Sequence, residues 1–362
     1  MSERLGARER IAIPRSDSPR ISVIIPSSAG NQFLLGALRA LQHAAPAEIP
    51  FETIVILNEA EAGSIGALDG VTGIHLEPAP VNLGLAGAGN RGRSIARGDL
   101  LVLLHDDAEV EPGWMEALVS TADGHPEAGA IGGKVLNMDG SLQNAGMILW
   151  RDGSTTAPWI TPPAPSAFDR LRAVDYCGTS SLLVRSATWD AVGGLDEQFY
   201  PVYYVDVDLS MSIRALGQIV LCEPASRIRH HRGASGRRPW QLFLTARNRE
   251  RFAAKWRVEL EEHHEPPADR SPHAIDRAIA RAEAFHAGVL HRGPSNPLTP
   301  GEPRRIERAE HDLLHLNLAL EVHKAYASHL ADQLDALQKT RWWQLREPAR
   351  SLLDRFWRRR RS

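Results

Sequence analysis

Residues 100–104 form a run of five apolar side chains, LLVLL, that leads directly into His105, Asp106 and Asp107. The run is short for a helix, and it lacks the alternation with polar residues that marks a strand with one face in solvent. Continuous apolar runs of this length are typical of strands in a parallel sheet with both faces covered. The run therefore predicts a buried strand that ends on two adjacent carboxylates.

Three more short runs rich in β-branched residues or leucine precede it, namely ISVII (21–25), ETIVIL (52–57) and GIHLE (73–77). Between the first two runs, leucines recur at helical spacing. They are Leu34, Leu35, Leu38 and Leu41. Strand, helix and strand in this order predict an α/β fold. The length of 362 residues suits one large domain with an extension, because single domains rarely exceed about 300 residues.

Charge and cysteine content exclude several classes of protein. The formal net charge of -2 gives no support for a global attraction to nucleic acid or to another acidic partner. Two cysteines, Cys177 and Cys222, argue against a disulfide framework and against a structural zinc site, and they suit a reducing compartment. No signal-peptide core and no apolar stretch of about 18 residues occurs. We therefore expect a cytoplasmic protein that does not span a membrane.

The carboxylates at the end of the apolar run have two interpretations. Ligands of α/β proteins bind beyond the carboxyl ends of the strands, and Mg²⁺ or Mn²⁺ prefers carboxylate oxygens together with substrate phosphates. This favours a metal and nucleotide site. The alternative is that Asp106 and Asp107 form a solvated strand end or cap the helix predicted at EPGWMEALVSTA (111–122).

A nearby glycine pattern, GAGNRG (87–92), matches that of a dinucleotide-binding turn. Such a turn follows its strand at once, whereas residues 78–86 separate this pattern from GIHLE. The match is therefore a weak indication of a dehydrogenase.

A longer stretch around this pattern resembles the nucleotide-sugar-binding half of family 2 glycosyltransferases, which have the GT-A fold. The stretch is residues 82–118, NLGLAGAGNRGRSIARGDLLVLLHDDAEVEPGWMEAL. The resemblance continues in the family's order through 129–149, 174–217, 228–235 and 247–256. It is closest to the rhamnosyl- and related transferases of bacterial surface polysaccharides. The order of the blocks makes it specific where each block alone is not.

The resemblance implies a divalent cation, Mg²⁺ or Mn²⁺, held against the donor diphosphate. Asp107 matches the last Asp of the family's D-x-D-like motif and is expected to be a direct ligand, while Asp106 is expected to contact the ribose or a metal-bound water. His105 stands where the family often has Asp or Asn. In RHHRGAS (229–235), His230 is the expected second ligand and His231 is the alternative. The alternative is that both histidines lie in a loop, where they form hydrogen bonds with the backbone and bind no metal.

The resemblance also implies a catalytic base. Asp206 in YYVDVDLS (203–210) matches the carboxylate that deprotonates the acceptor hydroxyl in an inverting transfer. Val205 replaces the usual polar neighbour, and Asp208 is expected to be a partner of Asp206 at the start of the following helix. The alternative is that both carboxylates only cap that helix.

The donor pocket follows the family less closely, because Leu57 replaces the Asp that reads the nucleotide base. The residues that match the donor-binding positions are Pro26, Ser27, Ser28, Asn58, Asn90, Arg91, Asp106, Gly178 and Thr179.

The predicted organisation has five parts: a flexible tail at 1–20, a GT-A domain at 21–258, a linker with a short helix at 259–303, an amphipathic helix at 304–340, and a basic tail at 341–362. Apolar heptads in the long helix, interrupted by His323, suit a coiled coil, which either pairs with a second copy in a homodimer or folds back on the domain. The tail is rich in Arg and Trp. It predicts peripheral attachment to an anionic membrane surface on the inner face of the cell membrane, with nucleic-acid binding or a solvated tail as alternatives.

These features together predict an inverting, metal-dependent hexosyl- or deoxyhexosyltransferase. It would move sugar from a nucleotide-diphosphate donor to a growing bacterial glycan, with a lipid-linked glycan as candidate acceptor. The alternative is a non-catalytic glycan-assembly scaffold with a degenerate GT-A domain, because Leu57 and Val205 depart from the family. A nucleotidyltransferase is disfavoured, since no Gly-rich, Arg- or Lys-bearing phosphate loop follows the first strand.

Overall fold

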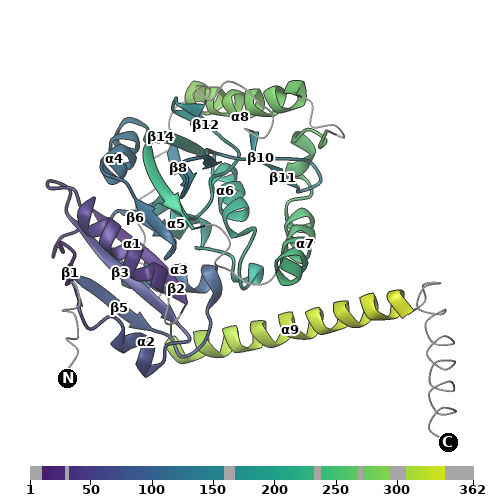
Figure 1. The fold of residues 1–362 in the computed structure, drawn as a ribbon. Coiled ribbons are helices and arrows are strands. Elements are labelled where there is room, and N and C mark those ends of the chain that lie inside the picture. Colours follow the sequence, from purple (N-terminus) through teal and green to yellow (C-terminus); the bar gives the residue numbers. More distant parts are fainter. Residues whose placement is uncertain are drawn as a thin grey trace, which may run out of the picture. The chain divides into compact units, whose positions relative to one another are not determined.

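The computed structural model describes residues 10–28, 32–158, 168–231, 238–267, 272–292 and 307–338. The chain divides into two units, residues 1–316 and 317–362. The first unit contains one large sheet with helices on both sides (Figure 1).

The strand order of the sheet is β12-β14-β8-β13-β6-β2-β3-β5. Its bounds are Arg172–Ala173 for β12, Ile219–His230 for β14, Ala128–Asn137 for β8, Ser181–Arg185 for β13, Leu100–Leu104 for β6, Ile21–Ser28 for β2, Phe51–Asn58 for β3 and Ile74–Pro78 for β5. Two short strands lie off this path: β7 (Ala108–Val110) pairs with β14, and β9 (Leu142–Asn144) pairs with β8.

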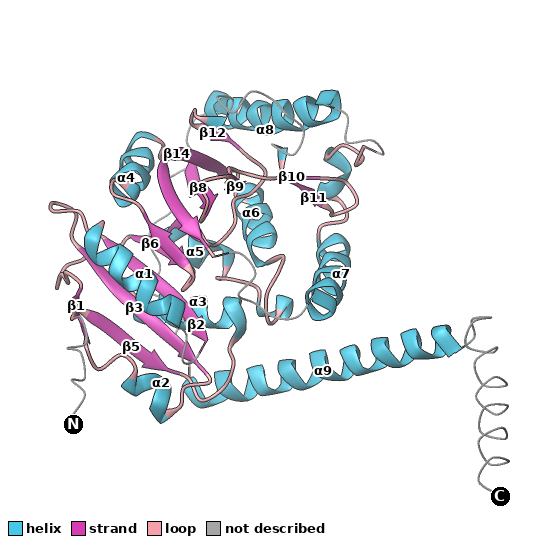
Figure 2. Ribbon diagram, in the orientation of Figure 1, coloured by secondary structure: helices cyan, strands magenta, loops and turns pink. Residues whose placement is uncertain are grey.

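The sheet is mixed rather than wholly parallel. Strands β5, β3, β2 and β6 run parallel, as the apolar runs predict, but β13 is antiparallel to both of its neighbours. Figure 2 shows the strands as one curved sheet. The α/β prediction is confirmed, whereas the reversed direction of β13 follows from no pattern in the sequence.

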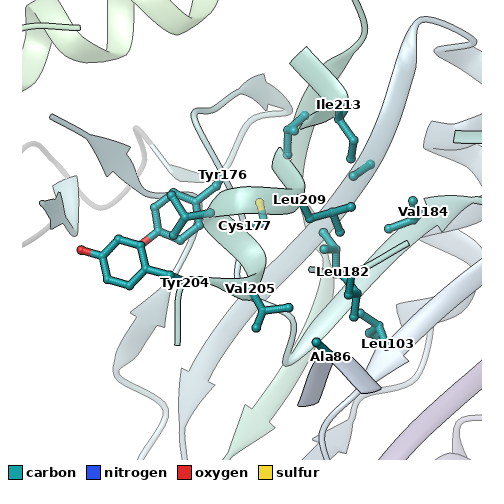
Figure 3. Close-up of a cluster of buried hydrophobic side chains, with 14 of the residues drawn as sticks. Ala86, Leu103, Tyr176, Cys177, Leu182, Val184, Tyr204, Val205, Leu209 and Ile213 are labelled. Atoms are coloured by element: carbon teal, nitrogen blue, oxygen red, sulfur yellow. The ribbon is translucent and has the colours of Figure 1, made fainter. Parts of the chain in front are cut away.

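Strand β6 shows why its five residues are all apolar. Leu101 and Leu103 face one hydrophobic core, while Leu100, Val102 and Leu104 face another on the opposite side of the sheet. Successive side chains of a strand point to opposite faces, so a strand covered on both sides has no position for a polar residue. Figure 3 shows part of the first core, where side chains of β6 and β13 meet α6.

The helices cover both faces. Those of the first unit are α1 (Gln32–His43), α2 (Ala62–Gly66), α3 (Gly84–Ile95), α4 (Trp114–Gly124), α5 (Ser186–Val192), α6 (Val205–Ala215), α7 (Arg238–Lys255) and α8 (Pro272–Arg292), with the 3-10 helices η3 (Glu197–Phe199) and η4 (Glu259–Glu262). Small strands β10 (Ile148–Leu149) and β11 (Thr155–Thr156) form a separate hairpin.

The glycines of GAGNRG lie within α3 and serve packing. A Cβ on Gly92 would come within 2.3 Å of Ile24 on β2, and one on Gly89 within 2.7 Å of Leu195. The pattern therefore lets the helix approach the sheet closely, and it does not form a dinucleotide-binding turn between strand and helix.

Two predicted boundaries need correction. Residues 11–13 are not a flexible tail, because β1 (Ile11–Ala12) pairs with β4 (Val71–Thr72) and both Ile11 and Ile13 are buried. Residues 259–303 are not merely a linker, because α8 is held on the domain. Asp175 accepts hydrogen bonds from Arg214 and from Arg281 of α8.

The long helix is α9 (Arg308–Gln338), and its first residues, up to Leu316, belong to the first unit. In the second unit, Leu320, Leu330 and Leu334 are exposed, and self-association through them stays a prediction. The basic tail at 341–362 lies outside the described residues. Among the helices that are described, we find none with the length and hydropathy that crossing a membrane requires.

Candidate active site

Three strands of the parallel half end beside one another and supply the first group of polar residues. β6 is followed by His105, Asp106 and Asp107, β2 ends in Ser27 and Ser28, and β3 ends at Asn58. The Ser27 hydroxyl donates to Asp106 Oδ2 at 2.8 Å. The backbone N–H of Ser28 donates to the same oxygen at 3.3 Å. Asp106 is therefore fixed by the loop after the first strand of the sheet.

His230 reaches Asp107 because β14 runs antiparallel to β7, which pairs His230 with Ala108. His230 Nε2 lies 2.9 Å from Asp107 Oδ1, and His105 Nδ1 lies 3.8 Å from the same oxygen. The geometry at His230 Nε2 is not that of a hydrogen bond, and this buried atom has no hydrogen-bond partner among the described residues. The three donors can converge on one ion.

The other ring nitrogen of His230 explains its orientation. Nδ1 lies 2.7 Å from Gln143 Oε1 on β9, so Nδ1–H donates to this oxygen and Nε2 is the ring nitrogen that faces Asp107. Metal-bound histidines usually have a second partner of this kind. Sequence reasoning missed Gln143, because only the folded sheet brings β9 beside β14. It placed His105 in the motif but did not predict it as a third donor.

Electrostatics keep these groups in the protonation states that a metal requires. Burial, followed by the neighbouring His230, lowers the pKa of His105 to about 4, so its ring is neutral at physiological pH. Burial alone would raise the pKa of Asp107, but His230 and His105 outweigh it, and the net pKa lies below the usual value. A neutral imidazole at His105 beside an ionised carboxylate at Asp107 suits a divalent cation.

His231 lies apart from this group. Its Nε2 lies 3.1 Å from Glu109 Oε1, and its ring lies 5.0 Å from that of Phe33. Of the two adjacent histidines, the geometry therefore favours His230 as a ligand.

Asp206 lies in the first turn of α6, after the N-cap Tyr204. Its Oδ1 accepts a hydrogen bond from the N–H of Val207 at 3.0 Å. Burial raises its pKa to about 6. Val205 is buried in the core below, which explains why no polar neighbour of Asp206 stands there.

Asp208 is not a partner of Asp206. It accepts hydrogen bonds from the Lys255 ammonium at 2.9 Å and from the Trp256 indole N–H at 2.7 Å. This carboxylate holds α7 against α6, and its role is structural.

Two cavities adjoin at the ends of these strands, and both include His105 and Asp107 in their walls. The smaller, of about 250 Å³, is lined by residues that include Pro26, Ser27, Ser28, Asn58 and Asp106. The larger, of about 800 Å³, is lined by residues that include His230, Gly178, Thr179, Tyr176 and Asp206. Asn58 also accepts a hydrogen bond from the Leu83 N–H at 3.1 Å.

Asn90 and Arg91 are not among the residues that line either cavity, and their part in donor binding stays a prediction. The Asn90 amide bonds the Leu195 backbone and the Glu197 carboxylate. Arg91 is buried and pairs with Asp312 at 2.7 Å. Both side chains therefore already have partners within the first unit.

Comparison with known proteins then decides the class. Residues 22–191 match the family model described as Glycosyl transferase family 2. The chain contains a family 2 glycosyltransferase domain. The crystal structure of GalNAc-T7 with UDP, GalNAc and Mn²⁺ shares its GT-A fold, with a TM-score of 0.53 and 17% identity over 68% of this chain and 49% of that one.

Two curated relatives of this glycosyltransferase domain have names that concern glycan assembly. The O-antigen biosynthesis protein RfbC of Myxococcus xanthus is 29% identical over 242 residues, which is 63% of this chain but 18% of that protein. The N-acetylglucosaminyl-diphospho-decaprenol L-rhamnosyltransferase of Mycobacterium tuberculosis (strain CDC 1551 / Oshkosh) is 28% identical over 219 residues, 52% of this chain and 70% of the relative. The chain thus spans less than a fifth of the length of the first relative.

Proposed function

We propose that this glycosyltransferase domain is an active, inverting enzyme that uses a nucleotide-diphosphate sugar and a divalent cation. The observation that carries the proposal is one cavity lined by a half-buried carboxylate, Asp206, and by the convergent donors of His105, Asp107 and His230. An inverting transfer needs a group that stabilises charge on the leaving diphosphate and a base that takes the proton of the acceptor hydroxyl. Both must lie in the same cavity as the substrates.

His105, Asp107 and His230 are the residues that would hold Mg²⁺ or Mn²⁺, and the cation would neutralise charge on the departing nucleoside diphosphate. Ser27, Ser28, Asn58 and Pro26 would hold the nucleotide in the smaller cavity, where Asp106 is already fixed for a contact with the ribose or with a bound water. Gly178 and Thr179 would border the sugar.

Asp206 would act as the catalytic base. Its pKa of about 6 leaves it ionised at neutral pH, yet basic enough to take a proton from the acceptor hydroxyl as that oxygen attacks the anomeric carbon. The proton moves to Asp206, the new glycosidic bond forms, and the bond to the diphosphate breaks on the opposite face.

For the acceptor we infer a growing bacterial glycan on a lipid carrier, and for the donor a hexose or deoxyhexose nucleotide. The support comes from the name of the Mycobacterium tuberculosis relative, which acts on a diphospho-decaprenol substrate, and from the O-antigen name of the other.

The rival proposal is a scaffold that no longer binds a donor, and a thermal-shift experiment separates the two. We expect that one nucleoside diphosphate raises the apparent free energy of unfolding by about 2.7 kcal/mol when Mn²⁺ is present and the nucleotide is at about 100 times its own dissociation constant. The gain should shrink in chelator. If a panel of all common nucleoside diphosphates with Mn²⁺ leaves the melting temperature unchanged, the scaffold is the better account.

Peripheral membrane attachment through residues 341–362 is proposed from the sequence alone. Basic side chains near an anionic surface contribute about 1 kcal/mol each, and flanking tryptophans suit the headgroup region. We expect full-length protein to co-sediment with anionic liposomes and the protein truncated after residue 340 to stay in the supernatant, with donor hydrolysis unchanged. Equal sedimentation of both proteins would refute the attachment.

A further inference from the structure

A second cluster of metal-ligating side chains lies outside the cavities described above. It joins Glu197 of η3 to His311 and His315 of α9, all within the first unit. The two histidines stand four residues apart on a helix, so both rings lie on one face. Glu197 is more than 100 residues away in sequence.

The three donor atoms lie at the spacing of ligands around a small ion. Nε2 of His311 lies 3.1 Å from Glu197 Oε1, and Nε2 of His315 lies 3.1 Å from Glu197 Oε2. The two Nε2 atoms are 3.3 Å apart. A tetrahedral zinc ion with bonds of about 2.0–2.1 Å separates its ligands by about 3.3 Å, so the cluster needs little movement to accept one.

The surroundings hold the donors in place. His315 is fully buried, and its ring occupies space that a Cβ on Gly87 would fill, since that atom would lie 2.2 Å from Nε2. Asn90 donates to Glu197 Oε1 at 2.7 Å. Burial alone would raise the pKa of Glu197, but hydrogen bonds from His311, His315 and Asn90 outweigh it and hold the carboxylate ionised.

We propose that Glu197, His311 and His315 form a binding site for a zinc-type divalent cation, distinct from the site at Asp107. Two imidazoles and one carboxylate suit Zn²⁺. The site at Asp107 has the same donor set, but it opens on cavities where diphosphate oxygens could complete the shell of Mg²⁺ or Mn²⁺, whereas Glu197, His311 and His315 line neither of those cavities. The scarcity of cysteine, which argues against a structural zinc site, does not bear on a site of this composition. The inference does not depend on the proposed transferase activity.

One contact has to adjust when the ion binds. Arg91 Nη2 lies 2.8 Å from His311 Nδ1, whereas a metal on Nε2 places the ring proton on Nδ1. The guanidinium then gives up this contact and keeps its ion pair with Asp312, which is already formed at 2.7 Å. Without an ion, the same three groups form a hydrogen-bonded clamp, and this is the alternative that an experiment must exclude.

The site would brace a wall of the larger cavity. η3 leads directly into residues 200–203, of which Val202 and Tyr203 line that cavity, and the ring of Tyr200 lies 5.6 Å from that of His315. An ion at Glu197 would therefore fix the start of α9 and the cavity wall to each other.

The test uses the full-length protein, stripped with a chelator and then reloaded with Zn²⁺. We expect wild type to retain one more equivalent of zinc after gel filtration than Glu197→Gln and His315→Gln do, and Co²⁺ to give a tetrahedral absorption spectrum that both variants reduce. His286→Gln is the matched control, because His286 belongs to a third group, with His125 and Glu127, and should leave this equivalent in place.

Hydrogen–deuterium exchange on wild type gives a second readout that needs no variant to fold. Zinc should slow amide exchange in residues 308–316 and 197–199. Equal zinc content in wild type, Glu197→Gln and His315→Gln would overturn the proposal, as would zinc that leaves exchange in these segments unchanged. Either result would make the cluster a hydrogen-bonded clamp only.

Discussion

Replacing Asp206 by Asn should lower transfer by about 10²- to 10⁴-fold while nucleotide binding persists. Asn keeps the shape of the side chain and the acceptor for the Val207 N–H, but it cannot take a proton from the acceptor sugar. The measurement is transfer rate together with the dissociation constant of the nucleoside diphosphate. Parallel loss of binding and rate would instead indicate a structural residue.

Stability separates the two roles further. The pKa of Asp206 in the folded protein lies above that of the unfolded chain, so its ionisation at pH 7 disfavours the native state by about 3 kcal/mol. Below the unfolded pKa this cost is absent, and it appears as pH rises through about 6. Asp206→Asn removes this cost and keeps the acceptor for the Val207 N–H, so it should be at least as stable as wild type at pH 7, and a clearly less stable variant would contradict this.

Two controls accompany this variant. Asp208→Asn changes a carboxylate two residues along α6 that lies outside the cavity, and transfer should stay within about tenfold of wild type. The wild-type rate should fall about tenfold for each pH unit below about 6, where Asp206 becomes protonated. A rate that stays level down to pH 5 would argue against this base.

The second large effect is expected at Asp107. Asp107→Ala removes the carboxylate on which His105 and His230 converge, so Mn²⁺ should no longer strengthen nucleotide binding. Because a bound metal supplies several kcal/mol of charge stabilisation, we expect transfer to fall by at least about a hundredfold. The measurement is nucleotide affinity and transfer with Mn²⁺ and with chelator.

His231→Ala is the matched control for this variant. His231 is adjacent to His230 in sequence but contacts Glu109, so the response to Mn²⁺ should be retained. Near wild-type transfer by Asp107→Ala in the presence of chelator would refute the metal assignment.

Sequence predicted those features that depend on local pattern. The continuous apolar run at Leu100–Leu104 predicted a strand buried on both faces. The structure confirms this, because Leu101 and Leu103 lie in one core while the other three residues of the run lie in another. The strand end also located Asp106 and Asp107 correctly at the carboxyl edge of the sheet. Fold class followed because strand and helix periodicities are local properties.

Features that depend on the pairing of strands far apart in the chain could not be predicted from the sequence. The pairing of β14 with β7 determines that His230, rather than His231, faces Asp107, and β9 brings in Gln143. Asn90 and Arg91 matched a motif, but the motif could not show that their side of α3 packs on Glu197 and on α9. The short strand at Ile11–Ala12, with Ile11 buried, was missed because two residues carry too little periodicity.

The central claim, that one cavity binds a nucleotide sugar and activates an acceptor, is tested most directly by a donor screen. Wild type and Asp206→Asn would each be incubated with a panel of nucleotide-diphosphate sugars and Mn²⁺, with and without lipid-linked glycan acceptors, and released nucleoside diphosphate measured by mass spectrometry. The account predicts release from one donor by wild type, increased by acceptor, with release by Asp206→Asn lower by at least about a hundredfold. Equal release by both proteins, or none by wild type from any donor, would contradict it.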